Sequence, residues 1–108
     1  KIEQLKIIET EIVKCFADFL SRLAQPSEAD GRLLDQTSVL FGSNLGNANA
    51  HDPSNLPIIL AGGGYDHGRH VAYDKRNNIP LCNLFVSLLS NMGLETASFA
   101  TSTGKLTW

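Results

Sequence analysis

Apolar residues recur every three or four positions over residues 1–24, which is the period of an amphipathic helix. Charged residues occupy the other faces of this predicted helix. We expect its apolar stripe to pack on the chain's own sheet, and a dimer seam is the alternative. The proline at position 26 and the polar run 27–31 are expected to end the helix and turn the chain. The stripe consists of Ile2, Leu5, Ile8, Ile12, Cys15, Phe16, Phe19, Leu20 and Leu23.

A second helical pattern covers about residues 80–92. Pro80 suits the first turn of a helix, and Gly93 is expected to end it. The tail 94–108 is rich in Ser, Thr and Ala without periodicity, which predicts irregular structure. The apolar positions of this second stripe are Leu81, Leu84, Phe85, Leu88, Leu89 and Met92.

Two short apolar runs between the helices, residues 38–41 and about 57–61, predict strands. Because both runs are almost wholly apolar, we expect buried strands of a parallel sheet. Residues 70–73 predict a short edge strand. The run 62–64 is all glycine, which permits positive φ angles and a close approach of the backbone to its surroundings. The predicted fold class is α/β, with short parallel strands flanked by two amphipathic helices.

The chain has 108 residues, which is the length of one small domain. Two buried strands and two helices cannot cover each other fully, so we expect a single-domain fragment from the C-terminal part of a larger α/β domain. The net charge of −2 and the pI near 5.8 argue against nucleic acid as a partner. No apolar run approaches the roughly 20 residues that cross a bilayer. Oligomeric state is not indicated.

The two cysteines, Cys15 and Cys82, both lie on helical patterns and are far apart in the sequence. Such cysteines are typically buried and reduced, and act as small apolar side chains. We therefore expect two buried thiols, with a disulfide as the alternative.

Histidines near the ends of the predicted strands suggest metal chemistry. A neutral imidazole is a common ligand of transition metals, and a neighbouring carboxylate adds an oxygen ligand. His51, Asp52 and His70 are the candidate metal ligands, and zinc or manganese is the candidate ion. Exposed loop histidines are the alternative, because the spacing matches no short zinc-binding motif. His67 is expected at the surface.

Amide and guanidinium groups on the same loops suggest polar substrate binding. Asn44, Asn47 and Asn49 can each donate and accept hydrogen bonds, and Arg69 can bind a phosphate, sulfate or carboxylate. Asparagine is also a favoured turn residue, so a purely structural role is the alternative. The sequence contains no nucleophile elbow, phosphate-binding P-loop or cysteine pair at ligand spacing, so no catalytic residue is assigned.

The central stretch resembles the C-terminal part of the HXXSHH family, bacterial domains of unknown function. The resemblance covers nearly the whole chain. It rests on residues 33–47 (LLDQTSVLFGSNLGN), His51, residues 56–63 (LPIILAGG), 68–70 (GRH), 80–84 (PLCNL), 92–93 and 98–99.

More distantly, the turn, threonine and apolar strand of residues 34–41 are similar to the last part of the alkaline phosphatase and sulfatase superfamily. This resemblance implies an alkaline-phosphatase-like sheet and a secreted or periplasmic, metal-dependent hydrolase of phosphate or sulfate esters, with its nucleophile upstream. Asn44 and Leu45 stand where that superfamily has an Asp-His metal pair. Pro53 stands where the HXXSHH family often has a second histidine. A non-catalytic domain that binds a carbohydrate or a protein through the Asn-rich loop is therefore the alternative.

Overall fold

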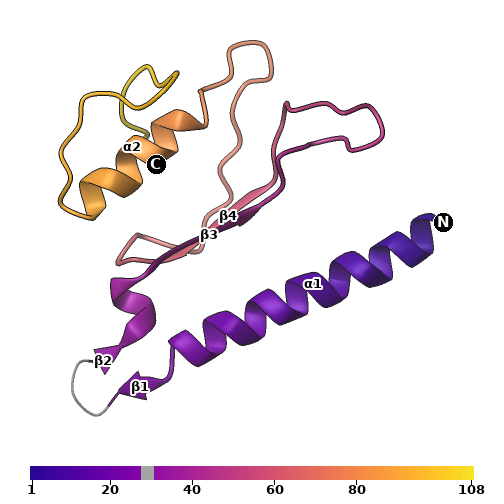
Figure 1. Ribbon diagram of the computed structural model, residues 1–108, viewed down its shortest axis with the longest axis horizontal. Helices are drawn as coiled ribbons and strands as arrows, with labels where there is room; N and C mark the ends of the chain where they lie inside the picture. The colour runs from indigo at the N-terminus through magenta and orange to yellow at the C-terminus, as the bar shows by residue number, and fades with distance from the viewer. Residues whose placement is uncertain (28–30) are drawn as a thin grey trace. The chain divides into compact units, whose positions relative to one another are not determined.

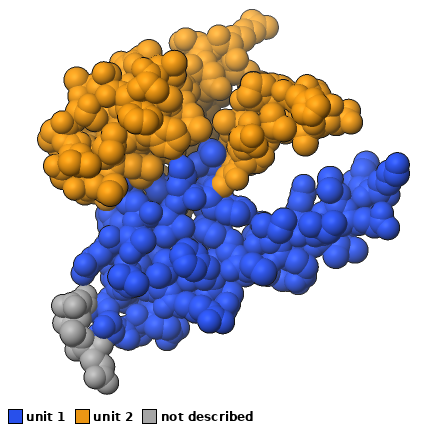
Figure 2. Space-filling view, in the orientation of Figure 1, with its two compact units in different colours: residues 1–41, 58–65 blue, residues 42–57, 66–108 orange. Residues whose placement is uncertain are grey.

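A computed structural model describes residues 1–27 and 31–108 (Figure 1). The chain divides into two compact units, residues 1–41 with 58–65 and residues 42–57 with 66–108 (Figure 2). The predicted turn after the first helix lies partly outside the described residues, at positions 28–30.

The first unit begins with helix α1, Ile2–Leu23, which confirms the predicted N-terminal helix. An acidic Glu3 in the first turn and a basic Arg22 in the last turn both complement the helix dipole. Ion pairs one turn apart, such as Lys14–Glu11 at 2.7 Å, neutralise the polar face. Helix formation is therefore favoured locally, although no residue of α1 is buried.

Five short elements complete the first unit. Strands β1, Pro26–Ser27, and β2, Gly31–Arg32, pair antiparallel, and a 3₁₀ helix, η1, covers Leu33–Gln36. Strands β3, Ser38–Gly42, and β4, Ile58–Gly62, follow and form a second two-stranded sheet. Both predicted strands are thus confirmed in position.

The prediction of a parallel, alkaline-phosphatase-like sheet is wrong. Strands β3 and β4 form an antiparallel pair (Figure 1). The Ser43 amide donates to the Pro57 carbonyl at 3.2 Å where β3 ends and β4 begins, and Gly63 lies against Ser38 at the opposite end. The strands are also half-exposed rather than buried, with only Gly62 fully covered. A hairpin with a long loop replaces the expected parallel crossover.

The second unit contains helix α2, Cys82–Asn91, which confirms the second predicted helix. Gly93 ends it as expected, with a φ of 80° and with its amide bonded to the Ser90 carbonyl at 3.0 Å. Among the described residues, the buried apolar side chains are Leu84 and Val86, both on α2. Within the described part of the chain, no helix is both long and apolar enough to cross a membrane.

Three smaller expectations need correction. Residues 70–73 form no strand. Cys15 and Cys82 are free thiols as expected, but Cys15 is exposed and Cys82 is only half-buried. The exposed position of Cys15 follows from α1 itself, because the first 15 residues of the chain are all exposed.

Candidate functional site

The loop between β3 and β4, residues 43–57, holds most of the residues that the sequence marks for chemistry. Inside this loop Asn47 and Asp52 form an antiparallel bridge, and the Asp52 amide donates to the Asn47 carbonyl at 3.0 Å. Residues 48–51 make the turn between them. The loop is therefore a small hairpin of its own, which we call the bridge loop.

Polar side chains hold the backbone of the bridge loop in place. The Asn47 Oδ1 atom accepts the amides of Asn49 at 3.1 Å and Ala50 at 3.3 Å, and Asp52 Oδ1 accepts the Ser54 amide at 2.8 Å. Both are turns of the kind in which an Asn or Asp side chain bonds the backbone two residues ahead. Asn47 and Asp52 thus serve the loop itself.

Hydrogen bonds at Asp52 also set its charge state. The Ser54 hydroxyl and, to a smaller extent, the Ser54 amide lower the pKa of the Asp52 carboxyl from its ordinary value. The carboxylate therefore stays ionised, and bonded to the loop, to a lower pH than an ordinary aspartate would.

Close packing of the backbone further restricts the bridge loop. A Cβ atom at Gly46 would overlap the carbonyl oxygens of Ser54 and Asn55, so only glycine fits at this position. His51 adopts a left-handed conformation with a φ of 50°. A histidine tolerates this region better than a β-branched residue, but the conformation still costs energy and persists because the surrounding loop imposes it.

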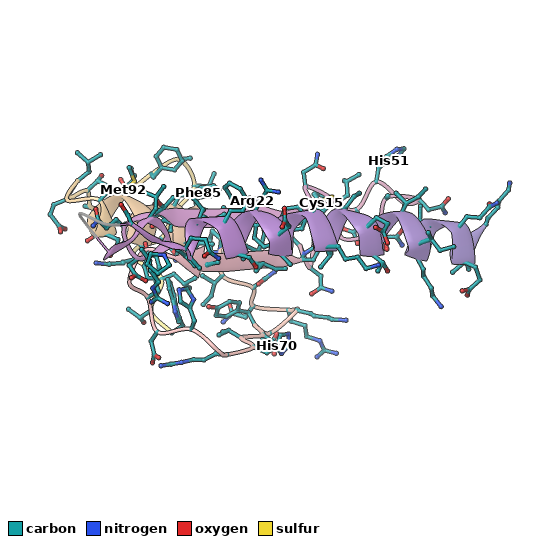
Figure 3. The ribbon with its side chains drawn as sticks, turned by 90° about the horizontal axis from the view of Figure 1, so that it is seen from below. Cys15, Arg22, His51, His70, Phe85 and Met92 are labelled. Atoms are coloured by element: carbon teal, nitrogen blue, oxygen red, sulfur yellow. The ribbon has the colours of Figure 1, made fainter. Side chains whose placement is uncertain are left out.

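Three further polar side chains of the bridge loop face solvent. Asn44, Asn49 and His51 are exposed, and within the described residues their side chains form no hydrogen bond. Figure 3 shows His51 projecting from its loop. The bridge loop therefore separates its polar residues into a set that fixes the backbone and a set that is displayed.

The predicted metal ligands are not gathered at one point. His51 and Asp52 are neighbours in the bridge loop, whereas Figure 3 shows His70 well apart from His51. Among the described residues, no three His, Cys, Asp or Glu side chains lie close enough to hold a metal ion together. No common ligand set of His51, Asp52 and His70 is present in this structure.

Arg69 is engaged near its own position in the chain. Its guanidinium forms an ion pair with Asp66, three residues earlier, and both side chains are largely exposed. Exposed pairs of this kind contribute little stability. Arg69 is not brought together with the asparagines of the bridge loop by any contact among the described residues.

Sequence reasoning missed two kinds of functional position. Ser54 helps to fix the charged Asp52, and the Asp-x-Ser spacing of an Asx turn was the signal for it. Asn83 and Ser87 are buried polar residues of α2, and the signal was their position, four residues apart and therefore on one face of the helix among apolar residues.

No protein-family model, no curated protein and no solved structure matches this chain.

Proposed function

We propose that the chain is a non-catalytic binding domain and that the bridge loop carries its binding surface, with a carbohydrate as the ligand class. The observation that carries this proposal is that the polar side chains of the loop have two different roles. Asn47 and Asp52 fix the backbone, while Asn44, Asn49 and His51 are displayed from it. A rigid backbone lowers the entropy lost when a ligand is bound.

Chemistry of the displayed groups favours a polyhydroxylated ligand. Each asparagine amide offers both donors and an acceptor, and an imidazole offers one of each when neutral. Neighbouring sugar hydroxyls need such mixed pairs of donors and acceptors. The loop carries no cluster of basic residues, so a highly charged ligand suits it less well.

The hydrolase hypothesis loses its main support, because it rested on resemblance to a superfamily whose parallel sheet is not formed by the residues that the structure describes. Membership of the HXXSHH-type family, a bacterial origin and a secreted or periplasmic location are proposals that rest on the sequence resemblance. A zinc or manganese ion held by His51, Asp52 or His70 is likewise a proposal that rests on the sequence. Elemental analysis of the wild type and of a His51→Ala, His70→Ala double variant tests it directly.

Nuclear magnetic resonance titration tests the binding proposal. The labelled chain is titrated with maltose, cellobiose and diacetylchitobiose, and amide shifts are followed over residues 43–57. We expect saturable shifts confined to the bridge loop with at least one sugar. An Asn44→Ala, Asn49→Ala variant should weaken that binding by about tenfold or more, because two displayed amides are removed while the loop bonds remain.

Asn78→Ala is the matched control, because Asn78 is an exposed asparagine on another loop. It should bind like the wild type. Titrations without shifts in the bridge loop, or equal binding by the Asn44→Ala, Asn49→Ala variant, would overturn the proposal.

A further inference from the structure

Helix α2 buries two polar side chains where an apolar surface would be expected. Asn83 is 6% exposed and Ser87 is 4% exposed, one helical turn apart. Buried polar groups are costly unless they find hydrogen-bond partners. Their partners lie in the C-terminal segment of the chain, residues 102–108, which we call the tail segment.

Asn83 binds the tail segment through both ends of its amide and through its carbonyl. Its Oδ1 atom accepts the Thr103 amide at 2.8 Å, and its Nδ2 atom donates to the Thr103 hydroxyl at 3.1 Å. The Asn83 carbonyl accepts the Leu106 amide at 3.1 Å. The Asn83 side chain thus both accepts a hydrogen bond from Thr103 and donates one to it.

Ser87 continues the same contact one turn along α2. Its hydroxyl donates to the Leu106 carbonyl at 2.6 Å. Leu106 therefore has both backbone groups bonded to α2, and Thr103 has its amide bonded there. Three of these four bonds engage main-chain atoms, so the surface recognises an extended backbone more than a particular sequence.

Burial along the tail segment alternates residue by residue. Positions 102, 104, 106 and 108 are half-buried, and positions 103, 105 and 107 are exposed. This period of two is the signature of an extended segment lying along a surface. Among the described residues the segment nevertheless pairs with no strand, and it is held by side chains of α2 and by the Asn83 carbonyl.

Ala100, two residues before the tail segment, has a strained backbone conformation. Ala100 has a φ of 48°, a conformation that alanine rarely adopts. Phe99, just before it, packs edge-on against Phe85 with ring centroids 6.0 Å apart, and Thr103, just after it, is bonded to Asn83. The Ser102 amide donates to the Phe99 carbonyl at 2.9 Å and the Phe99 amide donates to the Ser102 hydroxyl at 2.7 Å, so a closed turn holds the strain at Ala100. The contacts to α2 fix both ends of this turn, and its opening on release of the tail segment would relieve the strain.

We propose that Asn83 and Ser87 form a binding site for extended peptide segments, and that the tail segment is its displaceable resident occupant, which hinges at Ala100. The ligand class is an extended peptide with a Ser or Thr at the position of Thr103 and an apolar side chain such as Leu at that of Leu106. This site is independent of the bridge loop and of the carbohydrate proposal.

Competition between an added peptide and the tail segment gives the test. A segment tethered by a short flexible connection has an effective concentration in the millimolar range, so a free peptide must exceed that range to displace it. The probe is a synthetic peptide of residues 101–108 with Phe in place of Trp108. Trp108 is the only tryptophan of the chain, so its emission reports release of the tail segment.

The experiment uses the full chain and follows Trp108 emission together with amide exchange at Thr103 and Leu106. We expect the peptide to shift the emission to the red with saturation, and to remove exchange protection at both amides while the helical signal of α2 persists. An Asn83→Ala, Ser87→Ala variant should already show released Trp108 and should respond to peptide at least tenfold more weakly. Asn78→Ala is the control and should respond like the wild type.

The Ala100→Gly variant is a second test that leaves the contacts of Asn83 and Ser87 unchanged. Glycine removes the strain of the positive φ, so the docked form should become more stable and displacement should need several-fold more peptide. Loss of protection at Thr103 and Leu106 only together with global unfolding would overturn the proposal. Unchanged emission at peptide concentrations well above the millimolar range would do the same.

Discussion

The contact between the end of β4 and η1 depends on a glycine at position 62. Gly62 has a φ of 70° and lies directly against the carbonyl oxygens of Thr37 and Leu34. The amide of the next residue, Gly63, donates to the Leu34 carbonyl at 3.0 Å. The end of β4 is therefore pressed onto η1 through glycine, and a side chain has no room there.

Gly62→Ala should destabilise the first unit by about 2–4 kcal/mol, because a Cβ atom would overlap two backbone oxygens and the residue would keep a positive φ. Urea unfolding followed by circular dichroism measures the change. Gly64→Ala is the control, since Gly64 also has a positive φ, of 73°, but its Cβ would meet only ordinary contacts. It should cost about 1 kcal/mol, and equal costs for the two variants would contradict the steric argument.

Asp52 should make the bridge loop sensitive to acid. The pKa of its carboxyl is lowered in the folded loop by the Ser54 hydroxyl and amide, so its contribution to stability is complete above its unfolded pKa. That contribution is lost as the pH falls through the lower, folded pKa. We expect amide exchange at Ser54, relative to the intrinsic rate at each pH, to become faster as the pH falls from about 6 to 2.

Asp52→Asn should remove most of this pH dependence, and Asp66→Asn, at an exposed carboxylate outside the loop, should leave it intact. If the exchange profile of Ser54 stayed the same in the Asp52→Asn variant, another group would be responsible for the acid response.

At the scale of elements, α1 is fixed to the first unit through its C-terminal half. Phe16 stacks on Phe41 of β3, with ring centroids 4.5 Å apart and planes 17° from parallel. Leu20 and Leu23 are half-buried on the same side of the helix, whereas residues 1–15 are exposed. The predicted packing of the stripe on the chain's own sheet is thus confirmed only for its C-terminal end.

Phe16→Ala should destabilise the first unit by about 1–3 kcal/mol, because it removes the aromatic contact to Phe41. A double-mutant cycle with Phe41→Ala should give a coupling energy of about 1 kcal/mol. Phe19→Ala provides the matched control, since Phe19 is a phenylalanine of the same helix that is 47% exposed. A cost for Phe19→Ala as large as that for Phe16→Ala would mean that the stacked pair does not anchor α1.

At the scale of the whole molecule, the described chain exposes far more apolar surface than it buries. Two apolar side chains are buried, whereas sixteen large ones are exposed, seven of them on α1. The ion pairs of α1 join residues of the helix itself, so its charges do not depend on a partner. Exposed apolar surface on this scale binds apolar molecules.

We expect the chain to bind the apolar dye ANS, and an Ile8→Gln, Ile12→Gln variant to lower the dye fluorescence. Ile8 and Ile12 are 56% and 49% exposed, so their replacement removes accessible apolar surface. Glutamine favours helices at least as well as isoleucine, so the helical signal should be kept. Thr10→Gln and Glu11→Gln change polar residues of the same turns and should leave the fluorescence unchanged. A similar loss in this control would contradict the assignment of the dye site to the apolar stripe.

Local pattern was sufficient for both helices, for the positions of β3 and β4 and for the glycine turn after β4, because period, capping residues and backbone freedom act over a few neighbours. Strand direction was not decided locally, since a short apolar run fits a parallel strand and a hairpin arm alike. The absence of a helical pattern in residues 43–57 was a signal against a parallel crossover.

Tertiary structure alone decided which polar residues form hydrogen bonds within the chain. Asn47 and Asp52 are bonded within their loop and Asn83 is buried under the tail segment, because these roles depend on which distant atoms the folded backbone brings within hydrogen-bond reach.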